Sequence, residues 1–211
     1  MIVTLTINPC IDTSTSTGSV TAEHKLRCKQ PVHEPGGGGI NVSRVIQRLG
    51  GKTTALYPSG GPNGKHLEML IENEHLDHLP ISIEGLTREN LTVYEESSGQ
   101  QYRFTFPGAS LKVQELESVF GQIEKIKPHP DYIVASGSLP PDMTDDFYAR
   151  LSKQVSDWNS RLIVDTSGQA LLKAVEKGCY LIKPNMKEMS TLAQKEIENE
   201  NEIESVATKI I

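Results

Sequence analysis

The strongest constraint on this chain is a regular alternation between short apolar runs and amphipathic stripes. Apolar runs typical of buried strands fall at 1–7, 53–57, 131–137, 161–168 and 179–184. Apolar residues spaced three and four apart predict helices at about 40–49, 67–71, 113–126, 147–155, 169–178 and from 185 onward. Strands separated by helices pair in parallel, so the sequence predicts an α/β fold with a mostly parallel central sheet and helices on both faces.

Two segments break this alternation. Residues 10–34 are polar and β-branched with little helical pattern, and residues 91–106 have the pattern of a hairpin around Ser98 and Gly99. Together they are expected to form a small β-sheet beside the main domain. Because ligands of open α/β sheets lie beyond the carboxyl ends of the strands, such a sheet is placed to act as a lid. We therefore expect one domain, 1–211, that carries these two lid segments.

Composition limits the partners and the compartment. The 211 residues are 36% hydrophobic and 23% charged, which suits one globular domain, and the net charge of −6 argues against a nucleic-acid or membrane-surface partner. The N-terminal apolar run is too short for a signal peptide, and no stretch approaches the length of a membrane span. Cys10, Cys28 and Cys179 show no C-x-x-C spacing, so they are interpreted as reduced packing residues of a cytoplasmic protein.

Four consecutive glycines, Gly36–Gly39, stand directly before the helical stripe that begins at Val42. Glycine runs also occur in flexible linkers and tight turns. Here Pro35 stiffens the entry and Asn41 puts an amide in the first turn, which favours a ligand-binding loop at a helix N-terminus, where backbone N–H groups are unpaired. The Walker phosphate loop is excluded because no Gly-Lys-Ser/Thr follows, and the dinucleotide fingerprint is excluded because G-x-G-x-x-G is absent.

Six motifs together resemble the PfkB branch of the ribokinase-like sugar kinases. They are "TINPCID", "KLRC", "EPGGGGINVSR", "SGSLPP", "VDTSG" and "KPNMKE". The resemblance extends over all 211 residues and implies a ribokinase-like fold and ATP-dependent phosphorylation of a sugar phosphate. The wording around "KLRC" and "EPGGGGINV" favours fructose 6-phosphate, phosphorylated at its 1-hydroxyl to the 1,6-bisphosphate of glycolysis. Tagatose-6-phosphate kinase and 1-phosphofructokinase activities remain the alternatives within the branch.

The resemblance also implies a sugar-phosphate site. Its hydroxyl-binding residues are expected to be Asp12, Gly37, Gly38 and Asn41, although Asp12 taken without the glycines would favour an Asx turn. Its phosphate-binding residues are expected to be Lys25, Arg27, Arg88 and Arg103, since a guanidinium can bind two phosphate oxygens at once. In such kinases the lid packs against its twin, so we expect a homodimer in which Lys25 and Arg27 complete the neighbour's site.

The motif "KPNMKE" contains the residues that the resemblance implies for nucleotide binding. It implies that Lys183 and Asn185 lie near the ATP phosphates and that Glu188 organises Mg²⁺ through water. Asn185 and Glu188 are three residues apart at the expected start of a helix, and an ordinary N-cap predicts the same residues. Both interpretations can hold together.

One departure from the family concerns catalysis. The family's general base is the Asp of a G-A-G-D motif, and residues 1–211 contain no such motif. We therefore expect a C-terminally truncated kinase whose catalytic Asp lies beyond residue 211 and which is inactive as given. The alternative of another class is a non-catalytic remnant that binds only sugar phosphate or a partner chain. Truncation is also expected to expose the apolar stripe Ile203, Val206 and Ile210.

Overall fold

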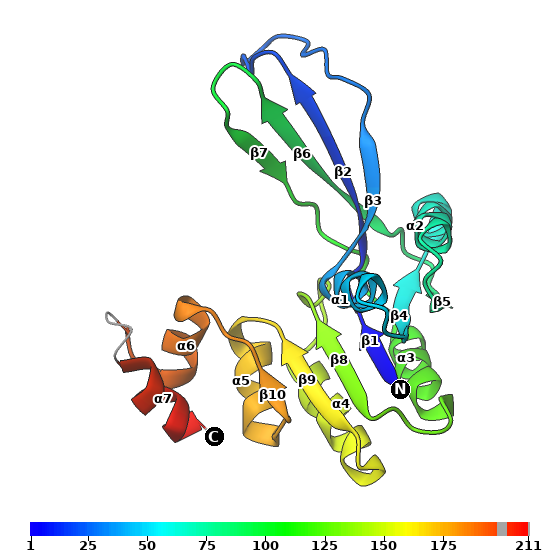
Figure 1. Ribbon diagram of the computed structural model, residues 1–211, viewed down its shortest axis with the longest axis vertical. Coiled ribbons are helices and arrows are strands. Elements are labelled where there is room, and N and C mark those ends of the chain that lie inside the picture. The colour runs from blue at the N-terminus through cyan, green and yellow to red at the C-terminus, as the bar shows by residue number, and fades with distance from the viewer. Residues whose placement is uncertain (198–201, 211) are drawn as a thin grey trace.

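The computed structural model describes residues 1–197 and 202–210, the side chains of Lys209 and Ile210 excepted. A six-stranded sheet lies at its centre, and its neighbouring strands pair in parallel (Figure 1). The strand order is β10-β9-β8-β1-β4-β5. The strands are β1 (Ile2–Leu5), β4 (Thr53–Ser59), β5 (His78–Ser82), β8 (Tyr132–Ser136), β9 (Arg161–Asp165) and β10 (Leu181–Ile182). The predicted parallel α/β fold is confirmed.

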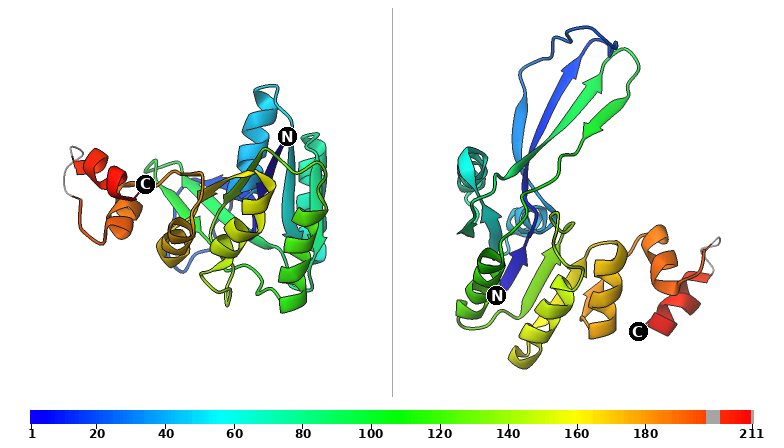
Figure 2. Two further views of the ribbon diagram at one scale, coloured as in Figure 1. Left: turned by 90° about the horizontal axis from the view of Figure 1, so that it is seen from below. Right: turned by 180° about the vertical axis from the view of Figure 1, so that it is seen from behind.

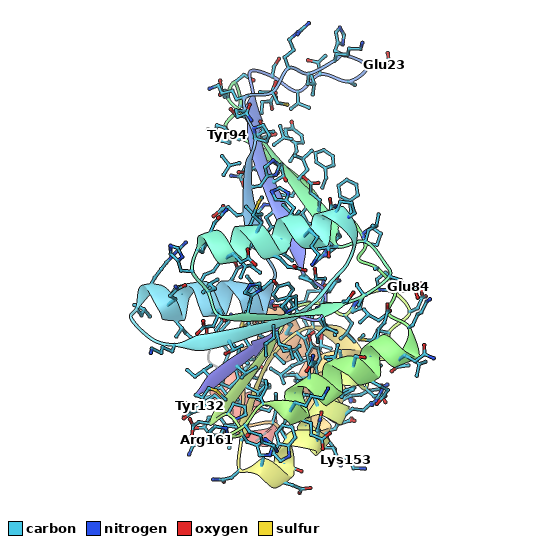
Figure 3. All side chains as sticks on the ribbon, turned by 90° about the vertical axis from the view of Figure 1, so that its right-hand side faces the viewer. Glu23, Glu84, Tyr94, Tyr132, Lys153 and Arg161 are labelled. Atoms are coloured by element: carbon cyan, nitrogen blue, oxygen red, sulfur yellow. The ribbon has the colours of Figure 1, made fainter. Side chains whose placement is uncertain are left out.

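Helices cover both faces of this sheet because its strands bury side chains on both sides. On β4, Ala55 and Tyr57 pack with α1 (Gly38–Arg48) and α2 (Gly61–Asn73), whereas Leu56 points into the opposite core. That opposite core is closed by α3 (Val113–Lys125), α4 (Phe147–Val155) and α5 (Gly168–Lys177). Figure 3 shows the two layers above and below the strands. A short 3₁₀ turn, Ser156–Trp158, follows α4.

A second, smaller sheet stands away from the main one (Figures 1 and 2). Its order is β3-β2-β6-β7, from β3 (Val32–Gly36), β2 (Cys10–Thr17), β6 (Arg88–Glu95) and β7 (Gln101–Phe104). The two outer pairs are antiparallel, and β2 and β6 pair in parallel at the centre. Residues 18–31 join β2 to β3 at the end farthest from the main sheet, where Glu23 is labelled in Figure 3. We call β3-β2-β6-β7 the small sheet.

The C-terminal helices correct one expectation. Val206 of α7 (Ile203–Ile210) is buried with Met189 of α6 (Met186–Ala193), and Ile203 packs against the same cluster. These two side chains therefore have partners, whereas the side chain of Ile210 lies outside the described residues. Figure 1 shows the helix pair beyond the β10 edge of the sheet.

Two smaller differences concern β5 and one cysteine. The sequence pattern did not predict β5, an edge strand that contains Pro80 and alternates irregularly between exposed and buried residues. Cys28 is exposed in the 18–31 connection, so it is not a packing residue. Cys10 is buried and Cys179 is partly buried, as expected.

A search of residues 1–197 and 202–210 for membrane spans finds no helix that is both long and apolar enough to cross a bilayer.

Candidate functional site

Polar side chains gather at the carboxyl ends of the parallel strands, the edge at which ligands of open α/β sheets bind. Thr6 follows β1, Ser136 ends β8 and Asp165 ends β9. The Ser136 hydroxyl donates to Oδ2 of Asp165 at 2.9 Å, and the Thr6 hydroxyl accepts from the Ile40 backbone N–H at 2.9 Å. Ser136 and Asp165 were not among the predicted site residues, although both fall near the ends of predicted strands.

The glycine run allows the start of α1 to lie directly on this edge. Gly37 has φ of 118°, a value that favours glycine, and a Cβ added at Gly38 would overlap the Ser136 hydroxyl. A Cβ at Gly39 would lie 2.6 Å from the carbonyl oxygen of Leu5. The run therefore brings bare backbone to the carboxyl edge of β1 and β8. Gly37 and Gly38 are only partly buried, so this backbone is accessible.

Asp12 lies on β2 beside this helix start, held by two donors. The Asn90 amide donates to Oδ1 of Asp12 at 3.0 Å, and the Cys10 thiol donates to the same oxygen at 3.3 Å. Burial and then the charge of Asp12 raise the pKa of Cys10 to about 12, so the thiol keeps its proton. Oδ2 of Asp12 has no hydrogen bond within the described part of the chain and faces the bare Cα of Gly36. That oxygen is free to accept from a ligand hydroxyl.

Arg88 begins β6 and pairs with Cys10 in the β2–β6 register. Its guanidinium donates to the carbonyl oxygens of Asn8 at 3.0 Å and Phe106 at 3.1 Å. Its Nε is buried and has no acceptor among the described residues. A buried cationic donor without an acceptor is costly.

Asn41 is the fourth residue of α1, at the end of its first turn, and its side chain is exposed. Its side-chain oxygen accepts from Arg44 at 3.3 Å, and Arg44 also pairs with Glu34 and Glu74. Hydrogen bonds and charge from these two glutamates raise the pKa of Arg44 further above its ordinary value. Arg44 therefore ties α1 to β3 and to the end of α2, and it orients the Asn41 amide.

The other predicted cations are distributed along the small sheet. Arg103 of β7 pairs with Thr92 and hence shares a face of the small sheet with Asp12 and Asn90, but it is exposed and its guanidinium donates to the Gln101 side chain. Lys25 and Arg27 lie in the 18–31 connection. The carbonyl of Arg27 accepts from Thr17, the last residue of β2, which is roughly 17 Å along the strand from Asp12. The structure does not bring Lys25 and Arg27 to Asp12 of the same chain.

The "KPNMKE" motif forms the start of α6, two strands from β8 along the same edge. Asn185 is the N-cap, with its side-chain oxygen accepting from the Glu188 N–H at 3.0 Å. Glu188 returns the bond by accepting from the Asn185 N–H at 2.8 Å, which completes a capping box. Lys183 is exposed just before the helix. The capping interpretation is thus met in full, and one Glu188 oxygen is used by it.

The larger hollows do not coincide with the predicted sugar residues. One of about 540 Å³ lies along α6 from Met186 to Ile197, and another of about 540 Å³ lies between α3 and α4 around Phe120 and Arg150. Beside Arg88 and Asn8 the chain leaves only about 10 Å³. No group of three metal-ligating side chains forms in the part of the chain that the structure describes.

A twisted parallel sheet with helices on both faces, a second sheet above its carboxyl edge and a glycine-led helix on that edge together define a class of α/β sugar-kinase folds. The family model described as "pfkB family carbohydrate kinase" matches residues 1–211. The chain belongs to this family of phosphotransferases.

Curated relatives and solved structures agree with this assignment. The chain is 41% identical over its whole length to the ATP-dependent 6-phosphofructokinase isozyme 2 of Escherichia coli K12, of which it covers 68%. It is 39% identical to the protein of the same name from Mycobacterium tuberculosis CDC 1551, of which it covers 62%. The structure of E. coli phosphofructokinase-2 in complex with fructose-6-phosphate superposes with a TM-score of 0.94, at 41% identity, covering 100% of this chain and 69% of that one. More distant relatives include the 1-phosphofructokinase of Bacillus subtilis, at 29% identity.

Proposed function

We infer that the protein transfers a phosphoryl group from ATP to a sugar phosphate, with fructose 6-phosphate as substrate and its 1-hydroxyl as acceptor. The observation that carries this proposal is the position of Asp12 and Arg88 on one face of the small sheet beside the glycine start of α1. A carboxylate oxygen suits sugar hydroxyls, and a guanidinium with an unpaired donor suits a phosphate. The names of the relatives at about 40% identity support the same substrate.

The roles divide between two ends of the carboxyl edge. The sugar end comprises Asp12, Gly37, Gly38 and Asn41 for the hydroxyls and Arg88 with Arg103 for the phosphate. The nucleotide end comprises Lys183, Asn185 and Glu188 at the start of α6. No residue among 1–211 is assigned as the general base.

Magnesium fits the nucleotide end only as an ion that keeps most of its waters. One carboxylate, Glu188, is offered there, and Mg²⁺ is commonly held by one or two carboxylates together with substrate phosphates. When bound, the ion would neutralise charge on the transferring phosphoryl group. The protein's own contribution is to place the sugar against the α1 backbone and to fix the two phosphate-bearing ligands along one edge of the sheet.

The small sheet is proposed to act as the lid and as the dimer contact. One of its faces carries the exposed apolar side chains Val32 and Tyr94, and a four-stranded sheet of this kind gains stability by burying them. A two-fold pairing through this sheet would let Lys25 and Arg27, at its far end, reach the sugar end of the other subunit. Sedimentation of the full-length protein is expected to show a dimer, and a stable monomer at high concentration would contradict it. Its site of action is proposed to be the cytoplasm.

The decisive test is turnover by the full-length protein. ADP release with MgATP is measured on fructose 6-phosphate, tagatose 6-phosphate and fructose 1-phosphate, and the product is analysed for the 1,6-bisphosphate. We expect the highest kcat/KM on fructose 6-phosphate. A preference for one of the other two would transfer the assignment to tagatose-6-phosphate kinase or 1-phosphofructokinase. Tight sugar-phosphate binding without turnover on any of them would favour the non-catalytic alternative.

A further inference from the structure

The side chain of Asn90 bonds on both sides to groups that the sugar end depends on. Its Nδ2 donates to Oδ1 of Asp12 at 3.0 Å and approaches Sγ of Cys10 at 3.2 Å. Its Oδ1 accepts from the backbone N–H of Phe106 at 3.3 Å. Asn90 therefore uses its amide in both directions, toward β2 on one side and toward the segment after β7 on the other.

The Phe106 peptide continues this chain of bonds to Arg88. Its carbonyl oxygen accepts from Nη1 of Arg88 at 3.1 Å, while Nη2 of Arg88 bonds to the carbonyl of Asn8 at 3.0 Å. The carboxylate proposed for the hydroxyls and the guanidinium proposed for the phosphate are thus linked through the Asn90 side-chain amide and the backbone of one residue, Phe106. Each link is a hydrogen bond to a charged group or to backbone, and such bonds fix orientation as well as distance.

We propose that Asn90 is a positioning residue for the sugar phosphate: it holds Oδ1 of Asp12 and leaves Oδ2 without a partner in the described chain, and through Phe106 it helps to set the separation between Asp12 and Arg88. This inference rests on the proposed function of Asp12. Asn90 is suited to the task because it donates to the carboxylate without adding charge. The Cys10 thiol is a weaker donor to the same oxygen and does not reach Phe106.

The consequence is selective for the substrate. Without the Asn90 amide, Asp12 is free to rotate and the two anchoring groups lose their fixed spacing. Binding of the sugar should weaken, whereas the chemistry at the 1-hydroxyl, which uses other groups, should change little. Loss of one hydrogen bond to a charged group corresponds to about tenfold or more in affinity.

The test compares Asn90→Ala, Asn90→Asp, Asp12→Ala and the matched control Asn63→Ala in the full-length protein. Asn63 also donates an amide hydrogen bond beside Arg88, to the Thr87 carbonyl at 3.1 Å, but it does not contact Asp12. Each variant is assayed with fructose 6-phosphate and with deoxy analogues. The analogue whose KM does not change in Asp12→Ala identifies the hydroxyl that Asp12 binds. Asn90→Ala is expected to raise KM for fructose 6-phosphate about tenfold, with kcat within about threefold of the wild type. It should leave KM for that analogue unchanged. The control Asn63→Ala should not raise KM for fructose 6-phosphate in this way.

The Asn90→Asp variant supplies a signature that a merely structural role would not give. It puts a second carboxyl within hydrogen-bond distance of Asp12. Two adjacent carboxylates repel each other, so the pair tends to hold one shared proton. Relative to the wild type at the same pH, its KM should therefore be near normal in mild acid, where the shared proton restores the bond. It should rise steeply toward pH 8.

The outcomes separate the two levels of the proposal. If Asp12→Ala leaves KM for fructose 6-phosphate unchanged, the proposed function of the sugar end is wrong. If Asp12→Ala raises KM but Asn90→Ala does not, or if Asn90→Asp follows the wild-type pH profile, the role of Asn90 is wrong and the proposed function stands.

Discussion

At the sugar end, side chains from β2 and β6 bond to one another beside the start of α1, whereas at the nucleotide end one helix start supplies the predicted groups Asn185 and Glu188. Asp12 is held by Asn90 and Cys10, and Arg88 by two carbonyl oxygens. Asn185 and Glu188 bond to each other, on the outer side of β10. The residues proposed for the sugar phosphate are thus held by tertiary contacts, while those proposed for the nucleotide are held by local helix geometry. The two kinds of binding should therefore respond to different substitutions.

The largest expected effect that would sharpen this contrast comes from Arg88→Ala. Loss of a charge-assisted contact to phosphate should weaken sugar-phosphate binding by about 1.5–3 kcal/mol or more. Affinity for ATP should remain nearly unaltered, because β10 and α6 do not contact Arg88. Calorimetric titration of the full-length protein with each ligand measures both. Arg150→Ala, which removes an arginine paired with Glu117 between α3 and α4, is the control. Equal losses for both ligands would sink the assignment of Arg88.

A second substitution tests whether the start of α1 needs a residue without a side chain in order to pack on β1. Gly39→Ala would place a Cβ 2.6 Å from the Leu5 carbonyl and 2.7 Å from Oγ1 of Thr6, and overpacking of this kind costs about 1–3 kcal/mol of unfolding free energy. Gly121→Ala is the matched control. Its Cβ would meet nothing within 4 Å on α3, so it should stabilise by about 0.5–1 kcal/mol. Urea unfolding of both variants decides, and a neutral Gly39→Ala would contradict the close packing of α1 on β1.

The nucleotide end offers a way to separate capping from catalysis. Asn185→Ala removes the N-cap and should cost about 1 kcal/mol. Glu188→Gln keeps a capping box, because Gln can serve at that position, and should leave stability nearly unchanged. If Glu188 also organises Mg²⁺, this variant should need more Mg²⁺ for half-maximal rate and show a lower kcat. If Glu188→Gln instead behaves like the wild type across a Mg²⁺ titration, Glu188 serves only as a helix-capping residue.

Most of the main sheet could be predicted from local pattern. Periodicity located α1, α3, α4 and α5 to within a few residues, because each buries one stripe against the sheet. β5 escaped notice because an edge strand with a proline has neither a continuous apolar run nor clean alternation. The end of β9 at Asp165, three residues before the predicted end, follows from α5 beginning at Gly168.

Local sequence pattern alone predicted only the contiguous parts of the candidate site, whereas Asp12 and Arg88 were predicted from the family resemblance. The glycine run and the "KPNMKE" motif are each a short continuous stretch of sequence, and each forms the start of a helix. Asn90 was missed because its partner Asp12 is 78 residues away and the two meet only through the parallel β2–β6 register. Spacing along one chain carries no signal for such a register. The same reasoning explains why the distance of Arg27 from Asp12 appears only once the strands are paired.

The smallest expected effect tests the support beneath the sugar end and depends on pH. Glu68 of α2 accepts from Ser59 at 2.6 Å and from Lys65 at 2.8 Å, next to the Gly60 and Thr87 contact that precedes Arg88. Burial alone would raise the pKa of Glu68, but the hydrogen bonds from Lys65 and Ser59 outweigh it and lower that pKa below its ordinary value. A carboxylate with a lowered folded-state pKa stabilises the fold above its unfolded pKa, and this stability is lost as pH falls through the folded value.

Glu68→Gln should therefore reduce the unfolding free energy by about 0.5–1 kcal/mol at pH 7, with the deficit shrinking as the pH falls below about 4. Urea titrations at both pH values measure it, with Glu124→Gln on α3 as the exposed control. Because α2 contacts β3 and β4 and does not touch β10, the same variant should change sugar-phosphate affinity more than ATP affinity. A deficit of the same size at both pH values would show that Glu68 acts through packing and not through its charge. In that case α2 would support the sugar end through the packing of Glu68, without a contribution from its charge.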